Sequence, residues 1–225
     1  MIEHSPIHRA PVGGEYYVFR DPVHNLIEID DETEGWLVRR ILRTRELQRL
    51  RFISQNGLGR FVYQGLEGTR FPHSLGSYHI ARRIIRSLIT RQPQKGEIPE
   101  RLRIGPNDLI SFPIAALLHD IGHGPLSHIW EQYLPEEEFE LFDHENRSIS
   151  ILESPNTEIG RFLATEINDE FRSYAPFLRT DVIAFLKKSH KLYYLLPLLS
   201  GNLDVDRLDF MSRDTRAAGV TYGFP

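Results

Sequence analysis

The chain has 225 residues, a formal net charge of −4 and 40% hydrophobic residues, so it can bury one sizeable core. Its charge gives no electrostatic basis for general binding to nucleic acid, and its lack of cysteine excludes disulfides, thiolate metal sites and cysteine nucleophiles. Because the chain has ten histidines, imidazole and carboxylate groups are the strong transition-metal ligands that remain.

The N-terminal part of the chain predicts an arm followed by a small β element. Residues 1–14 are polar and contain Pro and Gly, so we expect a loose arm before one domain that spans residues 15–225. Two β-prone runs, Tyr16–Phe19 and Leu26–Ile29, lie on either side of a proline turn. This pattern predicts a β-hairpin near the N-terminus.

Apolar residues recur at helical spacing through most of the remaining chain. The spacing in residues 33–54 predicts one helix. Residues 56–65 predict a turn, a short extended piece and a second turn. The apolar stretch over 108–122 predicts a central helix that begins or kinks at Pro113. The fold class that we predict is therefore mainly α. Other helices are predicted over residues 74–91, 125–134, 144–153, 157–170, 179–189 and 203–218, the last with Gly219 as its cap.

A run of polar residues, His119, Asp120 and two further histidines, follows the apolar helix in LLHDIGHGPLSH, residues 117–128. Polar groups in an interior are costly unless a partner satisfies them, so the pair indicates either a metal or an ordinary His–Asp hydrogen bond. Consecutive helical residues point roughly 100° apart, so both side chains reach one ion only near a helix end. A helix that ends at Gly122 would provide that end.

Two distant segments can complete a ligand set. His73, in RFPHSLG, lies just before the predicted helix over 74–91, and Asp206, in LDVDRLD, lies in the first turn of the last helix. Alternatively, Asp206 could serve only to stabilise the N-terminus of this helix with its negative charge, as we expect Asp204 to do. Two imidazoles with two carboxylates suit Mn, Fe, Zn, Co or Ni, and Mg less naturally. Such a metal would acidify a water and polarise a phosphorus–oxygen bond.

This arrangement, H…HD…D with H-D-x-G-H at its centre, resembles the HD-domain metal-dependent phosphohydrolases. Six segments in one order resemble, within that superfamily, the deoxynucleoside triphosphate triphosphohydrolases. They span about residues 20–220 and read RDPVHNLIEID, LQRLRFISQNGLGRFVYQG, TRFPHSLGS, LLHDIGHGPLSH, HEN and LDVDRLDFMSRD. The resemblance implies an HD-domain helical bundle, a divalent transition metal and a nucleotide substrate.

The resemblance also implies roles for individual residues. Glu131 stands where relatives commonly have Asp, Phe210 where many have Tyr and Asn56 where Leu is usual. Arginine at phosphate positions is physically apt because guanidinium matches phosphate oxygens, although each arginine could equally be ion-paired or solvated. The implied metal ligands are His73, His119, Asp120 and Asp206. The implied catalytic residues are His123, His144 and Glu131, of which Glu131 would orient His144. The implied substrate contacts are Gln55, Arg70, His128, Arg207, Phe210 and Asp214.

Three functions remain open. The first is hydrolysis of a deoxynucleoside triphosphate to nucleoside and triphosphate, and the second is an HD-type phosphatase or nuclease on another nucleotide or a nucleic-acid end. The third is a nucleotide-sensing or interaction module that a partner protein or a homo-oligomer completes, because larger relatives continue beyond the last matched segment. Nucleic acid is the less favoured partner. The sequence has neither an apolar run of about 18 residues nor the pattern of a signal peptide, so we expect a cytoplasmic protein without a membrane partner.

Overall fold

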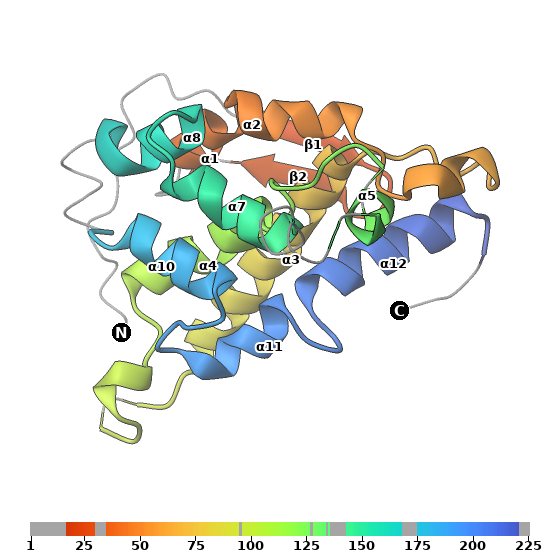
Figure 1. The fold of residues 1–225 in the computed structure, drawn as a ribbon. Coiled ribbons are helices and arrows are strands. Elements are labelled where there is room, and N and C mark those ends of the chain that lie inside the picture. Colours follow the sequence, from red (N-terminus) through yellow and green to blue (C-terminus); the bar gives the residue numbers. More distant parts are fainter. Residues whose placement is uncertain are drawn as a thin grey trace.

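The computed structural model describes residues 17–29, 35–94, 96–126, 128–133, 135, 143–167 and 175–220. These residues form a helical bundle with one two-stranded sheet, which confirms the predicted mainly α class (Figure 1). The arm predicted for residues 1–14 lies outside the described residues, so that boundary stays a prediction. In the described part of the chain, no helix is both long enough and apolar enough to cross a membrane.

The predicted hairpin is present near the N-terminus. Strand β1 (Tyr17–Asp21) pairs antiparallel with β2 (Asn25–Ile29). The Asp21 carboxylate closes the turn, because its Oδ1 accepts from the backbone N–H of Val23 at 2.8 Å and of His24 at 3.0 Å. An aspartate that bonds to the backbone two residues further on is a common way to stabilise a turn.

The single helix predicted for residues 33–54 is wrong, because the chain turns at Thr44. The buried Thr44 hydroxyl donates to the carbonyl of Ile41 at 2.7 Å, a local bond that competes with continued helix. The region contains α1 (Gly35–Leu42), α2 (Arg45–Gln48) and the 3-10 helix η1 (Arg49–Phe52). A further 3-10 helix, η2 (Gly57–Phe61), replaces the extended piece predicted within residues 56–65.

Two long helices cross at the centre of the bundle, and neither has the predicted bounds. Helix α3 (Arg70–Thr90) begins four residues earlier than predicted, so His73 lies inside its first turn and not before the helix. Helix α4 (Pro106–Leu118) contains Pro113 in its interior and does not begin there. It ends at Leu118 and not at Gly122, so His119 and Asp120 lie in the turn that follows it.

The remaining helices surround these two (Figure 1). Helix α7 (His144–Glu153) has the predicted bounds, and its N-cap Asp143 accepts from the N–H of Asn146 at 3.0 Å. Helix α12 (Val205–Ala217) has Asp204 as its predicted cap, and Gly219 follows its end with φ of +70°. The others are η3 (Glu100–Leu102), α5 (His128–Gln132), α8 (Glu158–Arg161), the π-helical turn η4 (Phe162–Glu166), α10 (Leu178–Leu186), η5 (Tyr193–Leu195) and α11 (Leu196–Leu199).

Three of these helices also depart from the predicted bounds. The helix predicted over residues 157–170 is α8 as far as Arg161, where the π-helical turn η4 follows. Helix α5 begins at His128, three residues after the proline expected to open it. The chain between them adopts a left-handed conformation at Leu126, with φ of +65°, so it cannot continue as helix there. Helix α10 ends at Leu186, before the predicted end at residue 189, and Lys188 also has a positive φ, of +56°. Neither η5 nor α11 was predicted.

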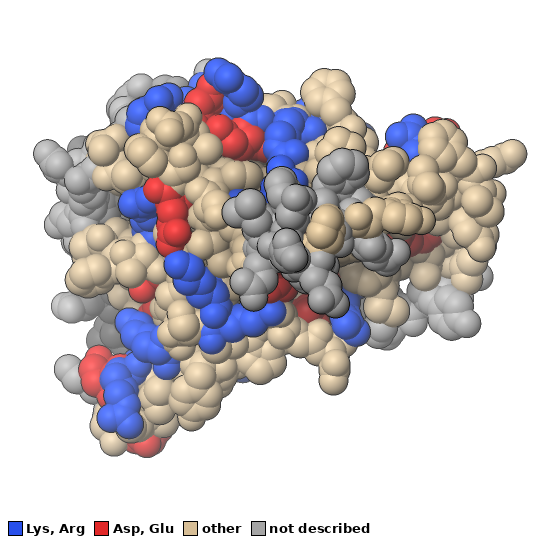
Figure 2. All heavy atoms as spheres, viewed as in Figure 1, with Lys and Arg blue, Asp and Glu red and all other residues tan. Residues whose placement is uncertain are grey.

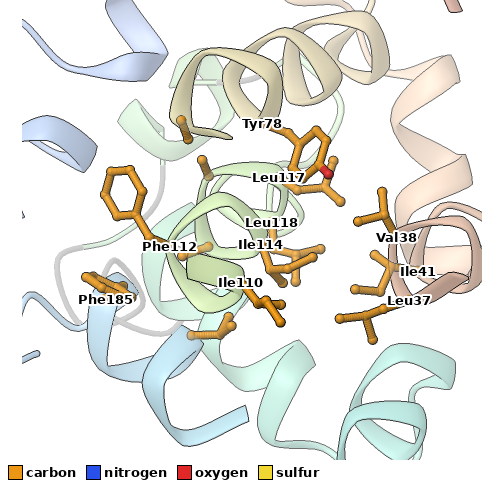
Figure 3. Packing of buried hydrophobic residues seen from close by; sticks show 14 of the residues in the cluster. Leu37, Val38, Ile41, Tyr78, Ile110, Phe112, Ile114, Leu117, Leu118 and Phe185 are labelled. Atoms are coloured by element: carbon orange, nitrogen blue, oxygen red, sulfur yellow. The ribbon is translucent and has the colours of Figure 1, made fainter. Parts of the chain in front are cut away.

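Helix α4 lies at the centre of the core, as its apolar sequence predicts (Figure 3). Ile110 and Ile114 are buried toward α1, and Phe112 lies edge-on to Phe185 of α10 with ring centroids 5.4 Å apart. Burying a side chain of this size stabilises the fold by about 1.5–3 kcal/mol. Because the core fixes α4 on several sides, the turn at its C-terminal end is held in a defined place.

Candidate metal centre and adjoining pocket

Four side chains from three parts of the chain meet beside the end of α4. His73 comes from α3, His119 and Asp120 from the turn after α4, and Asp206 from the first turn of α12. The Nε2 atom of His73 lies 2.9 Å from Asp206 Oδ1 and 3.4 Å from His119 Nε2. The Nε2 atom of His119 lies 3.2 Å from Asp120 Oδ1 and 3.6 Å from Asp206 Oδ1. The structure therefore brings the four sequence-predicted ligands together.

The hydrogen bonds of both imidazoles leave the Nε2 atoms available to a cation. His119 Nδ1 donates to the carbonyl of Ala116 at 2.8 Å, since a carbonyl oxygen only accepts. His73 Nδ1 lies 2.8 Å from a carboxylate oxygen of Asp209, which likewise only accepts when it is ionised. In the neutral rings both Nε2 atoms then carry lone pairs and face each other beside two carboxylates. A divalent metal fits this set of acceptors, which would otherwise have to share protons.

A cation at this site would compete with a proton for the Nε2 atom of His73. Burial lowers the pKa of His73, but hydrogen bonds to Asp206 and Asp209 outweigh burial and raise that pKa to about 10. Burial raises the pKa of Asp206, and its bonds to His119 and His73 reverse this and hold the pKa below the ordinary value. The pKa of Asp120 is also lowered, because the charges of His119 and Arg70 outweigh its burial. Both ligand carboxylates are therefore ionised at neutral pH.

Arg70 lies beside this centre and is buried with Asp120. Its Nη1 atom donates to Asp120 Oδ2, and only 3% of the Arg70 side chain is exposed. A charged pair that is buried in this way fixes both side chains, since separating them would leave a buried charge without compensation. Arg70 thus holds Asp120 in place while it also lines the adjoining pocket.

A second cluster of histidines adjoins the centre. Glu131 of α5 accepts from His144 at 3.0 Å through one oxygen and from His128 at 3.1 Å through the other. The His123 ring stacks on the His144 ring, with centroids 4.0 Å apart and planes 10° apart. His123 Nε2 also lies 3.2 Å from Asp120 Oδ1. The three predicted catalytic residues and His128 are therefore neighbours, and Glu131 contacts His144 as we expected.

The electrostatics of this cluster favour a neutral His123 ring and an ionised Glu131 carboxylate. Burial lowers the pKa of His123 to about 4, even though Asp120 acts in the opposite direction. The pKa of Glu131 is lowered, because hydrogen bonding from His128 and the charge of His144 outweigh its burial. At neutral pH His123 is therefore neutral while Glu131 carries a charge.

The turn that follows α4 is held by residues that the sequence analysis did not identify. Arg49 of η1 donates from Nη1 to the His123 carbonyl at 2.7 Å and from Nη2 to the Ile121 carbonyl. The buried Ser148 hydroxyl donates to the His119 carbonyl at 2.8 Å and accepts from the Gly122 N–H at 2.9 Å. Both sets of bonds depend on tertiary contacts, and no local pattern in the sequence points to them.

A cavity of about 320 Å³ opens over the two clusters. Its lining includes the predicted substrate contacts Gln55, Arg70, His128, Phe210 and Asp214, but not Arg207, which is exposed. Asn56, also in the lining, donates to Asp214 at 3.1 Å, a pairing that the sequence did not suggest. Six further lining residues were not predicted: Glu145, Phe185, Leu186, Lys188, Leu199 and Ser200.

A third group of possible ligands lies away from this pocket, at the N-terminal end of α4. His190 Nε2 lies 3.5 Å from Asp108 Oδ1 and 3.6 Å from Asp181 Oδ1. However, His190 Nδ1 accepts from the N–H of Leu192 at 3.1 Å, so the proton of the neutral ring is on Nε2. A metal needs the lone pair of that atom, so His190 in this tautomer is not a metal ligand.

Comparison with known proteins places the chain in a class that combines this helical bundle with the histidine and aspartate centre. A family model described as HD domain matches residues 70–193, which includes three of the four residues of the centre. The chain therefore belongs to the HD domain family.

Individual relatives agree with this assignment. The uncharacterized protein YwfO of Bacillus subtilis (strain 168) is 35% identical over 93% of this chain and 42% of that protein. The deoxynucleoside triphosphate triphosphohydrolase SAMHD1 of Gallus gallus is 32% identical over 92% of this chain and 35% of that protein. A crystal structure of a phosphohydrolase from Bacteroides thetaiotaomicron has a TM-score of 0.64 and 32% identity, over 92% of this chain and 43% of that chain. The chain spans less than half the length of each of these proteins.

Proposed function

We propose that the protein is a metal-dependent phosphohydrolase whose substrate is a nucleotide, with deoxynucleoside triphosphates as the preferred class. The observation that carries the proposal is a group of three possible ligands, His73, His119 and Asp206, whose ligand atoms all lie within 4.8 Å of one another. Asp120 Oδ1 adds a second carboxylate 3.2 Å from His119 Nε2, and a cluster of histidines lines the adjoining cavity. Relatives named as a phosphohydrolase and as a deoxynucleoside triphosphate triphosphohydrolase support the reaction class and the substrate class.

In this proposal, His73, His119, Asp120 and Asp206 hold one divalent transition metal. Two carboxylates balance the charge of a divalent ion, and the mixed nitrogen and oxygen ligands suit Mn, Fe, Zn, Co or Ni, with Mg less natural. When bound, the ion supplies Lewis acidity toward a phosphate oxygen and lowers the pKa of a water. All other steps belong to side chains of the protein.

The histidine cluster supplies the proton transfer that cleavage of a phosphate ester requires. Glu131 fixes the His144 ring with Nδ1 toward its carboxylate, so a ring that is protonated on both nitrogens would deliver the Nε2 proton to the leaving oxygen and keep the Nδ1 proton on the side of Glu131. His123 stacks on His144 and its Nε2 lies 3.2 Å from Asp120 Oδ1, so it would hold both side chains in place beside the reacting phosphate. His128 and Arg70 line the same cavity, and they would bind the remaining phosphate oxygens.

Other residues in the lining of the cavity would contact the proposed substrate beyond its reacting phosphate. Phe185, Leu186 and Leu199 provide apolar surface there, and Lys188 pairs with Glu145 at 3.0 Å beside them. Apolar walls with a few polar groups are the usual lining of a small-molecule site. On the face drawn in Figure 2, basic and acidic side chains are mixed, which favours a small nucleotide over a long nucleic acid.

Incubation of the purified chain with Mn²⁺ and a mixture of deoxynucleoside triphosphates tests the proposal. We expect nucleoside and free triphosphate, separated by ion-exchange chromatography, and no product from a His119→Ala variant. Nucleoside monophosphates, cyclic nucleotides and short single-stranded DNA serve as parallel substrates. Release of phosphate from these alone would replace the proposed substrate with another nucleotide or a nucleic-acid end. A protein that binds Mn²⁺ but hydrolyses none of them would instead be a nucleotide-sensing or interaction module.

A further inference from the structure

Asp209 is a fully buried carboxylate that none of the proposed chemical steps uses. It lies one turn after Asp206 on α12, and its side chain is 0% exposed. Its Oδ2 atom accepts from His73 Nδ1 at 2.8 Å, on the side of the ring opposite the proposed metal. A buried ionised carboxylate is stable only when several donors compensate it, and three residues provide them here.

The donors to Asp209 come from two different elements besides α3. Arg213, one turn further along α12, donates from Nη2 to Oδ1 at 2.8 Å and from Nε to Oδ2 at 3.0 Å. His24 Nε2, from the turn of the β-hairpin, lies 2.7 Å from Oδ1. Arg213 Nη1 also donates to Asp21 Oδ2 at 2.9 Å, and Asp21 closes the same hairpin turn. Each oxygen of Asp209 thus has two donors.

The packing of α3 on α12 is adapted to this carboxylate. A Cβ atom at Gly76 would lie 2.5 Å from Asp209 Cγ and 2.7 Å from Arg213 Nη2, so any larger residue would displace the network. Gly76 is one turn after His73 on the same helix. Because Gly76 has no side chain, Asp209 can reach Nδ1 of the His73 ring, while Asp206 faces Nε2 on the opposite edge of the ring.

We propose that Asp209 is the positioning residue for His73 and that it links the N-terminal hairpin to metal binding; the inference rests on the metal site of the proposed function. A carboxylate on Nδ1 fixes the tautomer and orientation of a metal-binding histidine and makes its Nε2 a stronger ligand. Because His24 and Asp21 hold the network together, hairpin and metal stabilise each other. Linkage requires that this coupling acts equally in both directions.

The test measures the affinity of the full chain for Mn²⁺ by equilibrium dialysis, after circular dichroism has shown that each variant is folded. Asp209→Asn keeps the shape and removes the charge, and we expect Mn²⁺ affinity to fall about 10- to 100-fold. His24→Ala removes one donor and should weaken binding several-fold, whereas His24→Gln keeps a donor at the Nε2 position and should restore it. The matched control is His79→Ala. The His79 ring lies 5.2 Å from that of His24 and has no bond to Asp209 among those described.

Hydrogen exchange provides a second readout that activity does not affect. Saturating Mn²⁺ should slow amide exchange in residues 17–29 of the wild type, and this slowing should be lost in His24→Ala. If Asp209→Asn fails to fold, the His24 pair and the exchange measurement decide alone. The inference is overturned if folded Asp209→Asn has the Mn²⁺ affinity of the wild type, or if Mn²⁺ does not change amide exchange in the wild-type hairpin. Either result leaves the proposed function standing. A wild-type chain that binds no Mn²⁺ overturns both.

Discussion

Gly122→Ala tests whether the turn after α4 and the first turn of α7 must approach as closely as the structure has them. A Cβ atom at Gly122 would lie 2.5 Å from the backbone N of Ser148 and nearer still to the carbonyl oxygen of His144. Ordinary contact begins at 3.4 Å, so α7 must retreat by about 1 Å, because backbone atoms cannot rotate away as a side-chain end can. Gly122 does not have a positive φ, so the effect is steric and not conformational.

The displacement has two measurable consequences. Forcing a methyl group into a packed site costs about 1–3 kcal/mol, and for a domain of this size each kcal/mol lowers Tm by about 2–4 °C. Moving His144 by about 1 Å relative to the turn should lower kcat about 100-fold. Thermal unfolding followed by circular dichroism and steady-state hydrolysis of a deoxynucleoside triphosphate measure the two effects.

Gly124→Ala is the matched control from the same turn. A Cβ atom at Gly124 would first meet Arg147 Nη1 at 3.4 Å, the end of a flexible side chain that can move aside. We expect its Tm and kcat to stay close to those of the wild type. If Gly122→Ala is as stable and active as Gly124→Ala, then α7 does not approach the turn as described and the reasoning is refuted.

Three further predictions concern pH, proton transfer and metal. Burial and the neighbouring His24, Arg83 and Arg82 lower the pKa of His79 from 6.5 to about 4, so the unfolded chain binds a proton there that the folded chain does not. The stability that depends on the neutral ring is complete above pH 6.5 and is lost as pH falls toward 4. In urea unfolding, the free energy of unfolding of His79→Gln should therefore fall less than that of the wild type over that range. At pH 7.5 the two free energies should match. Glu131→Gln should lower kcat about 100-fold with little change in KM, since Glu131 acts through another side chain; a change confined to KM would contradict that role. Mn²⁺ at about 100 times its Kd should add about 2.7 kcal/mol to the free energy of unfolding, and an equal gain in His119→Ala would place the ion elsewhere.

Local patterns were enough to predict some elements and not others. The bounds of α7 and the cap of α12 follow from short-range signals, a helical spacing and an aspartate at the N-terminus. The division of the helix at Thr44 depends on one side-chain bond that competes with helix, and the positive φ of Leu126 depends on how the chain reaches α5. Spacing alone does not contain that information, because propensity yields to tertiary packing.

The same distinction applies to the candidate site. The four residues of the candidate metal centre could be chosen from the sequence because each lies in a recognisable motif, and the structure brings them together. Asp209 lies in the same motif as Asp206, yet its partner is a histidine 136 residues away, so only the folded chain reveals the pairing. Arg207 was chosen from the same motif but lies on an exposed part of α12, outside the cavity.

The meeting of α3 with α12 also affects the order of assembly. During synthesis, the ribosome completes the first helix long before the second, so the ligands on α3 and after α4 must wait for nearly the whole chain described here. An ion bound by residues of both α3 and α12 would close the long loop between these helices. Cross-links across long loops restrict the unfolded chain most. If the proposed metal binds, its loading would depend on α12, because a nascent chain without that helix lacks the carboxylate of Asp206 and the Asp209 contact to His73.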